Sequence, residues 1–176
     1  VVVTGIEKVI PTLEDLSLLL RLLIRSATGQ SISNYVSLLT GVKAPAEHDG
    51  PEHLYFVLVD NGRADLVASE FQEMLRCIRC GACMNHCPVY QSIGGHAYGW
   101  VYPGPMGSVL TPLYQGLDKS LDLPHAATLC NQCGVVCPVK IPLPELLRKL
   151  REKQVDKNLR PLMERLMLKA WAWVAC

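Results

Sequence analysis

The chain has 176 residues, of which 49% are hydrophobic and 19% are charged, and its formal net charge is +1. This balance excludes an intrinsically disordered chain, and no apolar run reaches the roughly 18 residues that a membrane-spanning helix needs. The length allows one ordinary domain or two small ones. Eight cysteines raise the main question, because they could form disulfides, bind metal or remain buried thiols.

The first 70 residues alternate between strand and helix signals. Residues 1–3 are apolar and predict a short strand. Thr12, with Asp15 at the capping-box position, predicts the start of a helix. The leucines that follow occupy so much of the helix circumference that we expect this helix to be largely buried.

Two later segments also predict strands. Residues 31–39 are rich in Ile, Tyr, Val and Ser and predict one or two strands, and a polar loop over 43–51 follows them. Residues 54–59 are uniformly apolar, which is typical of a strand buried on both faces. Together these segments predict α/β layering with a partly parallel sheet.

The pattern becomes helical beyond about residue 64, and we expect two domains, over residues 1–68 and 69–176. Residues 66–76 predict a helix. A second helix is predicted by the i, i+3, i+4, i+7 spacing of Leu143, Leu146, Leu147 and Leu150. The same spacing continues over residues 159–170, which predicts a further helix.

Charge is concentrated at the end of the chain. From Lys140 onward there are nine Lys or Arg residues and four Asp or Glu residues. This excess suits a solvated helix face, and it also suits an acidic partner or peripheral contact with lipid headgroups.

The cysteines form two motifs. The first reads Cys77-Ile-Arg-Cys80-Gly-Ala-Cys83-Met-Asn-His-Cys87-Pro88, the C-x2-C-x2-C-x3-C-P run of bacterial ferredoxins. In that run three thiolates on a tight turn bind one cubane, and the fourth binds a second cluster. The second motif reads Cys130-Asn-Gln-Cys133-Gly-Val-Val-Cys137-Pro138, and Ala127 stands where its first cysteine would be.

Two other uses of these cysteines fit less well. Disulfides at spacings of two and three residues would be strained, and nothing in the sequence indicates an oxidising compartment. Structural zinc also uses C-x2-C, but usually as two separated pairs and not as a run of four ending in Pro. The motifs therefore predict iron–sulfur clusters.

Ligand exchange between the two motifs predicts how the clusters are held. The first, a [4Fe–4S] cluster, takes Cys77, Cys80, Cys83 and Cys137, and the second takes Cys87, Cys130 and Cys133. With three cysteines, the second is a [4Fe–4S] cluster with a non-cysteine ligand, a [4Fe–4S] cluster with an open iron, or a [3Fe–4S] cluster. His125 and Cys176 are candidate fourth ligands, although they also fit a loop histidine and an ordinary helix thiol.

A long linker over residues 89–129 separates the motifs. Its length, with helical Leu spacing after the second motif, favours an α-helical ferredoxin over the small β-type. The linker carries four aromatic residues that suit either a docking or cluster-shielding surface, or packing of the loop over the clusters: His96, Tyr98, Trp100 and Tyr102.

With these motifs in hand, the chain resembles the iron–sulfur, LUD-domain subunits of bacterial L-lactate utilization complexes. The resemblance rests on both cysteine motifs and on Ile93-Gly-Gly-His-Ala-Tyr-Gly-Trp-Val-Tyr-Pro-Gly-Pro. It also rests on Gly5-Ile-Glu-Lys-Val-Ile-Pro-Thr-Leu-Glu-Asp, Arg25-Ser-Ala-Thr-Gly-Gln and Val59-Asp-Asn-Gly-Arg. Because members of this family are longer, we expect the chain to be a C-terminal fragment.

The resemblance implies the second part of a LUD domain, an α/β fold of the NagB/CoA-transferase-like type, followed by the helical ferredoxin. It implies an electron-transfer subunit that works with other subunits and a redox partner or carrier to oxidise L-lactate to pyruvate in the cytoplasm. The rival interpretations are direct catalysis at an open iron, a structural role, or a subunit of a heterodisulfide-reductase-like or glycerol-3-phosphate-dehydrogenase-like complex.

No catalytic residue for lactate chemistry is assigned from the sequence, and nothing in it predicts nucleic-acid binding. Gly5, Thr28, Gly29 and Asp60–Arg63 are candidates for a small-ligand pocket at strand ends. The same residues also fit ordinary turn chemistry.

Overall fold

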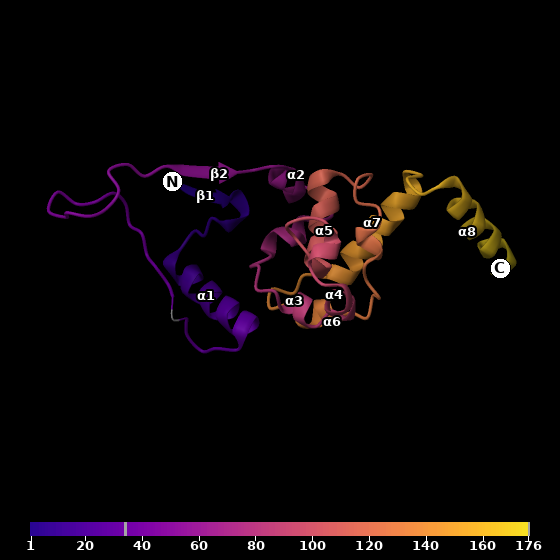
Figure 1. The fold of residues 1–176 in the computed structure, drawn as a ribbon, viewed down its shortest axis with the longest axis horizontal. Coiled ribbons are helices and arrows are strands. Elements are labelled where there is room, and N and C mark those ends of the chain that lie inside the picture. Colours follow the sequence, from indigo (N-terminus) through magenta and orange to yellow (C-terminus); the bar gives the residue numbers. More distant parts are fainter. Residues whose placement is uncertain (34, 176) are drawn as a thin grey trace. The chain divides into compact units, whose positions relative to one another are not determined.

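The computed structural model describes residues 1–33 and 35–175 and divides the chain into two compact units, Val1–Cys80 and Gly81–Cys176 (Figure 1). Over these described ranges, no helix is long and apolar enough to cross a membrane. The expected boundary between residues 68 and 69 stays a prediction.

The first unit contains a small parallel sheet. β1 (Val2–Gly5) pairs with β2 (Phe56–Val59), and the register places Val2 opposite Phe56 and Gly5 opposite Val59. The strand expected at the start of the chain and the parallel pairing are therefore confirmed. Because the strands are parallel, their carboxyl ends lie at the same edge of the sheet.

The long helix of this unit, α1 (Leu13–Thr28), begins as the sequence predicts. The Thr12 hydroxyl accepts a hydrogen bond from the backbone N–H of Asp15 at 3.1 Å, which satisfies one of the free amides of the first turn. The helix ends at Gly29, whose φ of 73° is the left-handed conformation that glycine adopts without strain.

Three expectations for the first unit are wrong. α1 has no buried residue, and β2 is exposed, with 66% of Phe56 accessible to solvent. A two-stranded sheet with one long helix is too small to cover either apolar surface. The segment expected as one or two strands has no strand over residues 31–33 and 35–39, while its residue 34 lies outside the described residues.

The segment after β2 is broken where one helix is expected over residues 66–76. α2 (Arg63–Val67) and the 3-10 helix η2 (Gln72–Arg76) are separated by a turn. The break lets Leu66, Phe71 and Met74 all point inward, where they form the buried core of this unit. The short 3-10 helix η1 (Ile6–Lys8) follows β1.

The second unit is helical and is built around α5 (Gly104–Gln115), which is buried from Gly104 to Pro112. α7 (Leu143–Asp156) packs against α5, and the four leucines predicted to share its inner face are all buried (Figure 1). The helix expected near the end of the chain is α8 (Leu162–Ala175).

Shorter helices surround α5 and carry the cysteine motifs. The first motif runs into α3 (Ala82–Asn85) and α4 (Pro88–Ile93), and the second into α6 (Gln132–Val135). The linker between them adds the 3-10 helices η3 (His96–Tyr98) and η4 (Leu123–His125). α3 contacts α4, α5 and α6, so the two motifs meet within this unit.

Candidate metal centre

Three of the predicted ligands line one pocket in the second unit. Cys87, Cys130 and Cys133 line a small cavity of about 20 Å³. Most of the other lining residues are apolar, including Pro105, Pro144 and Leu147. A pocket with thiol donors in an apolar wall is the chemistry that iron–sulfur clusters need, since thiolates bind the irons and low solvent access sets the potential.

The helix ends around the pocket position these thiols. Cys87 is the N-cap of α4, and its sulfur lies 3.5 Å from the backbone N–H of Tyr90. Pro88 takes the first position of that helix, where its missing N–H costs no hydrogen bond. Cys130 and Cys133 flank the start of α6, where Asn131 adopts the left-handed conformation with φ 66°.

The three sulfurs influence one another. Burial and, to a smaller extent, the neighbouring thiols of Cys87 and Cys130 together raise the pKa of Cys133 to about 11. At Cys130 the backbone N–H of Gln132 and the Thr128 side chain lower the pKa. Crowded thiolates repel one another, and bound iron would offset that repulsion.

Cys137 has an environment like that of Cys87. Both cysteines precede a proline, both are more than nine-tenths buried, and each sulfur lies near a backbone N–H a few residues later. For Cys137 the partner is Ile141, at 3.4 Å. Amide donors of this kind stabilise a thiolate and tune a cluster that it binds.

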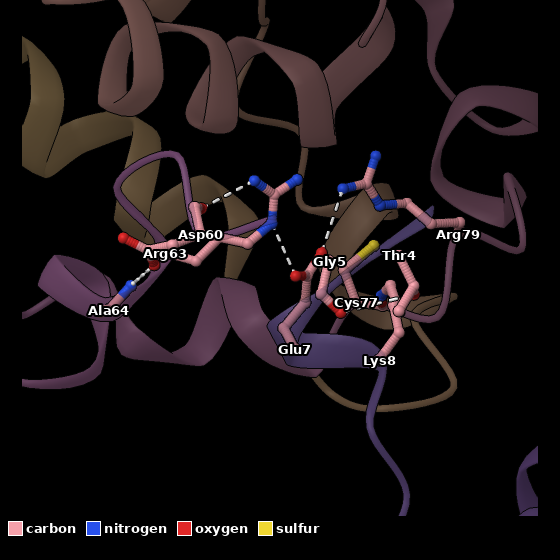
Figure 2. Close-up of polar contacts among 9 residues, drawn as sticks. All are labelled: Thr4, Gly5, Glu7, Lys8, Asp60, Arg63, Ala64, Cys77 and Arg79. Atoms are coloured by element: carbon pink, nitrogen blue, oxygen red, sulfur yellow. Dashed lines mark hydrogen bonds and ion pairs between the residues drawn. The ribbon is translucent and has the colours of Figure 1, made fainter. Parts of the chain in front are cut away.

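Cys77 and Cys80 belong to the first unit, and Cys77 lies next to a cluster of charges (Figure 2). Lys8 Nζ donates a hydrogen bond to the Cys77 carbonyl oxygen. Burial raises the pKa of the Cys77 thiol, while the backbone N–H of Arg79 and the charges of Arg79 and Lys8 lower it. The first ligand of the motif therefore lies between two cations.

A buried carboxylate, Glu7, pairs with Arg79 and with a second arginine, Arg63. Figure 2 shows Glu7 between two guanidinium groups, 2.6 Å from Arg63 Nε and 3.7 Å from Arg79. The Arg63 guanidinium also donates to the Asp60 carbonyl oxygen at 2.9 Å. The network runs from the carboxyl edge of the sheet to the turn that carries Cys77.

The same network occupies part of the expected small-ligand pocket. A Cβ on Gly5 would lie 2.8 Å from Arg63 Nε, so Gly5 and Arg63 do come together. Asp60 acts as a turn residue, since its side chain accepts the N–H of Ala64 at 2.7 Å. Gly29, by contrast, ends α1 and has no atom within 4 Å of the position of its missing Cβ.

The histidine named as a candidate fourth ligand has another partner. His125 Nε2 lies 2.8 Å from Gln154 Oε1, and His125 does not line the three-cysteine pocket. Ala127 does line it, as expected of the vacant first position of the motif. Cys176 lies outside the described residues.

A different histidine, which the motif spacing did not single out as a ligand, lines this pocket. His86 directly precedes Cys87, and its Nδ1 lies 3.0 Å from the carbonyl oxygen of Ala82. Its position inside the C-x3-C spacing of the first motif could have drawn attention to it.

The linker aromatics mainly pack among themselves. Trp100, Tyr102 and Tyr114 form a group of edge-to-face contacts with ring centroids 5.5–6.5 Å apart. Tyr98 is buried and packs against Tyr90 at 6.0 Å. His96 is exposed. These contacts favour loop packing for Tyr98, Trp100 and Tyr102.

A single metal ion and an iron–sulfur cluster require different spacings of their ligands. Among the described residues, no three Cys, His, Asp or Glu side chains lie close enough to hold a single metal ion. Ligands of a zinc ion all approach one centre at about 2.3 Å, whereas each thiolate of a four-iron cluster binds a different iron and lies farther from the others.

Comparison with known families matches both parts of the chain. The LUD domain model matches residues 1–59, and the 4Fe-4S dicluster domain model matches residues 73–141. The combination of a LUD domain and a dicluster domain expected from the sequence is therefore confirmed.

Curated relatives match nearly the whole chain. A protein from Anoxybacillus flavithermus is 50% identical over 97% of the chain, and one from Bacillus subtilis is 48% identical over 97%. Both carry the same name. This chain is similar to lactate utilization protein B.

A further lactate utilization protein B, from Bacillus mycoides, is 50% identical over 97% of the chain. The resemblance inferred from the sequence is confirmed by these matches. The chain spans only about a third of the length of each lactate utilization protein B, 36% for the Anoxybacillus protein. No solved structure matches the chain.

Proposed function

We propose that this chain is the electron-transferring iron–sulfur part of a complex that oxidises L-lactate to pyruvate in the cytoplasm. The observation that carries the proposal is the apolar pocket shared by Cys87, Cys130 and Cys133. Support for the substrate comes from the name of the relatives, lactate utilization protein B. Support for the cofactor comes from the dicluster domain match over residues 73–141.

The proposed fold is the later part of a NagB/CoA-transferase-like LUD domain followed by an α-helical ferredoxin. The parallel pairing of β1 and β2 supports the first part, and the helical packing around α5 supports the second. By motif spacing, the first cluster is a [4Fe–4S] cluster on Cys77, Cys80, Cys83 and Cys137. The second takes Cys87, Cys130 and Cys133, as a [4Fe–4S] or a [3Fe–4S] cluster.

Two clusters suit this reaction. Oxidation of lactate to pyruvate releases two electrons and two protons, and each cluster accepts one electron at a time. A pair of clusters can therefore take both electrons from the lactate-oxidising subunit and deliver them singly to an acceptor. The role of the chain's own residues is to bind the clusters, limit water and set their potentials.

The test is whether lactate reduces the clusters, and with which partners. We expect L-lactate to produce the EPR signal of reduced clusters only when the partner subunits of the complex are added to the anaerobic protein. Dithionite should produce the same signal without partners. Clusters that dithionite reduces but that lactate with partners leaves oxidised would contradict the proposal.

One observation favours direct catalysis as a second candidate. Ala127 lines the pocket at the position of the missing cysteine, so the second cluster has an iron without a cysteine ligand there if it holds four irons. An open iron can bind a substrate hydroxyl or carboxylate. If catalysis occurs there, L-lactate added to the protein without partners should change the EPR spectrum of the second cluster and leave the first unchanged.

A further inference from the structure

Tyr98 carries a buried hydroxyl without a partner. Only 4% of the residue is exposed, and among the described residues no acceptor lies within hydrogen-bond distance of its hydroxyl. Buried hydroxyls in native proteins are nearly always paired, because burial removes their hydrogen bonds to water. Because this unpaired hydroxyl lies near the predicted ligands, we expect its acceptor to be present when the protein holds its clusters.

Tyr98 lies close to the residues around Cys87. Its ring packs 6.0 Å from the ring of Tyr90, and the backbone N–H of Tyr90 lies 3.5 Å from Cys87 Sγ. η3, which carries Tyr98, contacts α5, and α5 contacts α3 and α4, the helices that hold Cys83 and Cys87. The phenol thus lies near ligands that the motif assigns to two different clusters.

The phenol remains a donor at neutral pH. Burial, with smaller effects from Cys87, Tyr90 and Cys83, raises the pKa of Tyr98 to about 12. A protonated phenol has an O–H to donate, and thiolates and cluster sulfides are acceptors.

We propose that the Tyr98 hydroxyl donates a hydrogen bond to a sulfur of the cluster that Cys87 binds, and so raises the reduction potential of that cluster. This proposal rests on the cluster assignment made under Proposed function. Reduction adds negative charge to the sulfurs, so a donor bond stabilises the reduced state more than the oxidised state. Tyr98 acts on the cluster through this hydrogen bond and does not bind iron.

The test is an EPR-monitored redox titration of Tyr98→Phe, which removes only the hydroxyl. Tyr114→Phe is the matched control, since it removes a phenol hydroxyl from the aromatic group of the same unit. We expect unchanged iron content and, at a fixed potential, an about tenfold lower ratio of reduced to oxidised second cluster, equivalent to 59 mV. The first cluster and the control should titrate as in the unchanged protein.

A second measurement detects the proton on sulfur directly. Resonance Raman spectra in H2O and D2O should differ in the Fe–S stretching region of the unchanged protein because an exchangeable proton bonds to sulfur. The H2O/D2O difference should be smaller in Tyr98→Phe than in the unchanged protein. An unchanged potential in an iron-replete Tyr98→Phe, or the absence of any D2O shift if that variant loses its clusters, would overturn the proposal. Chemical reductants drive both experiments, so neither outcome depends on lactate as the substrate.

Discussion

Lys8 Nζ donates a hydrogen bond to the carbonyl oxygen of Cys77, although 69 residues separate the two in the sequence. The contact joins the 3-10 helix after β1 to the first residue of the cysteine motif. It places a cation from the LUD-like part of the chain beside a predicted ligand of the first cluster. The positive charge should stabilise the more negative, reduced state of that cluster.

Replacing Lys8 with methionine should therefore lower the reduction potential of the first cluster. The substitution keeps the apolar stem and removes the charge that favours the more negative, reduced cluster. Because Lys8 is only half-buried, we expect a several-fold and at most roughly tenfold fall in the reduced fraction at a fixed potential. A redox titration followed by EPR measures it.

The control for Lys8→Met is Lys43→Met, which removes a cation of the same unit that pairs with exposed Glu52. It should leave both potentials unchanged. Equal shifts of both clusters in Lys8→Met would contradict a local effect at Cys77.

Leu147 belongs both to the core and to the wall of the three-cysteine pocket, because it is 1% exposed and lines that pocket. Leu147→Ala should lower the free energy of unfolding by about 2–5 kcal/mol, because it leaves a cavity between α7 and the pocket. Denaturant unfolding followed by circular dichroism, with cluster content followed by visible absorbance, measures both effects.

Val155 offers a comparison on the same helix, because its side chain is 63% exposed. Val155→Ala should change the free energy of unfolding by no more than about 0.5 kcal/mol. If Leu147→Ala lowered the free energy of unfolding no more than Val155→Ala, the claim that Leu147 fills the core between α7 and the pocket would be contradicted.

His125 predicts a dependence of stability on pH. Burial lowers the pKa of His125, although its hydrogen bond to Gln154 opposes that shift. The unfolded chain, with an ordinary histidine pKa of about 6.5, therefore takes up this proton first as pH falls. The His125 contribution is complete above about pH 6.5 and is lost as pH falls through the lower folded pKa.

Unfolding at pH 7.5 and pH 5.5 tests this dependence. We expect His125→Gln to lose less stability between the two pH values than the unchanged protein, while His48→Gln, at an exposed loop position, behaves like the unchanged protein. Identical pH dependence in His125→Gln and the unchanged protein would show that His125 does not titrate with folding.

Local signals predicted the start of α1 and the buried face of α7. The Thr12 cap and the leucine spacing of α7 each depend on residues within a few turns, so the sequence contains the whole signal. The expected burial of α1 and β2 was wrong because burial depends on neighbouring elements, and the first unit supplies too few. The contact between Lys8 and Cys77 has no local signal at all.

The candidate site was predicted in outline and missed in detail. Motif spacing grouped Cys87 with Cys130 and Cys133, and these three line one pocket. The spacing could not predict that His125 binds Gln154 while His86 lines that pocket, because side-chain direction depends on tertiary packing. The division of all seven cysteines between two clusters stays a prediction.

The most direct test of the account is the cluster content of the anaerobic protein and of two cysteine variants, by iron and sulfide analysis with EPR. The unchanged protein should hold about seven or eight irons per chain, in two clusters. Cys133→Ala should lose the second cluster and keep the EPR signal of the first, and Cys83→Ala should do the reverse. Zinc in place of iron, or a single cluster of about four irons that either variant abolishes, would contradict it.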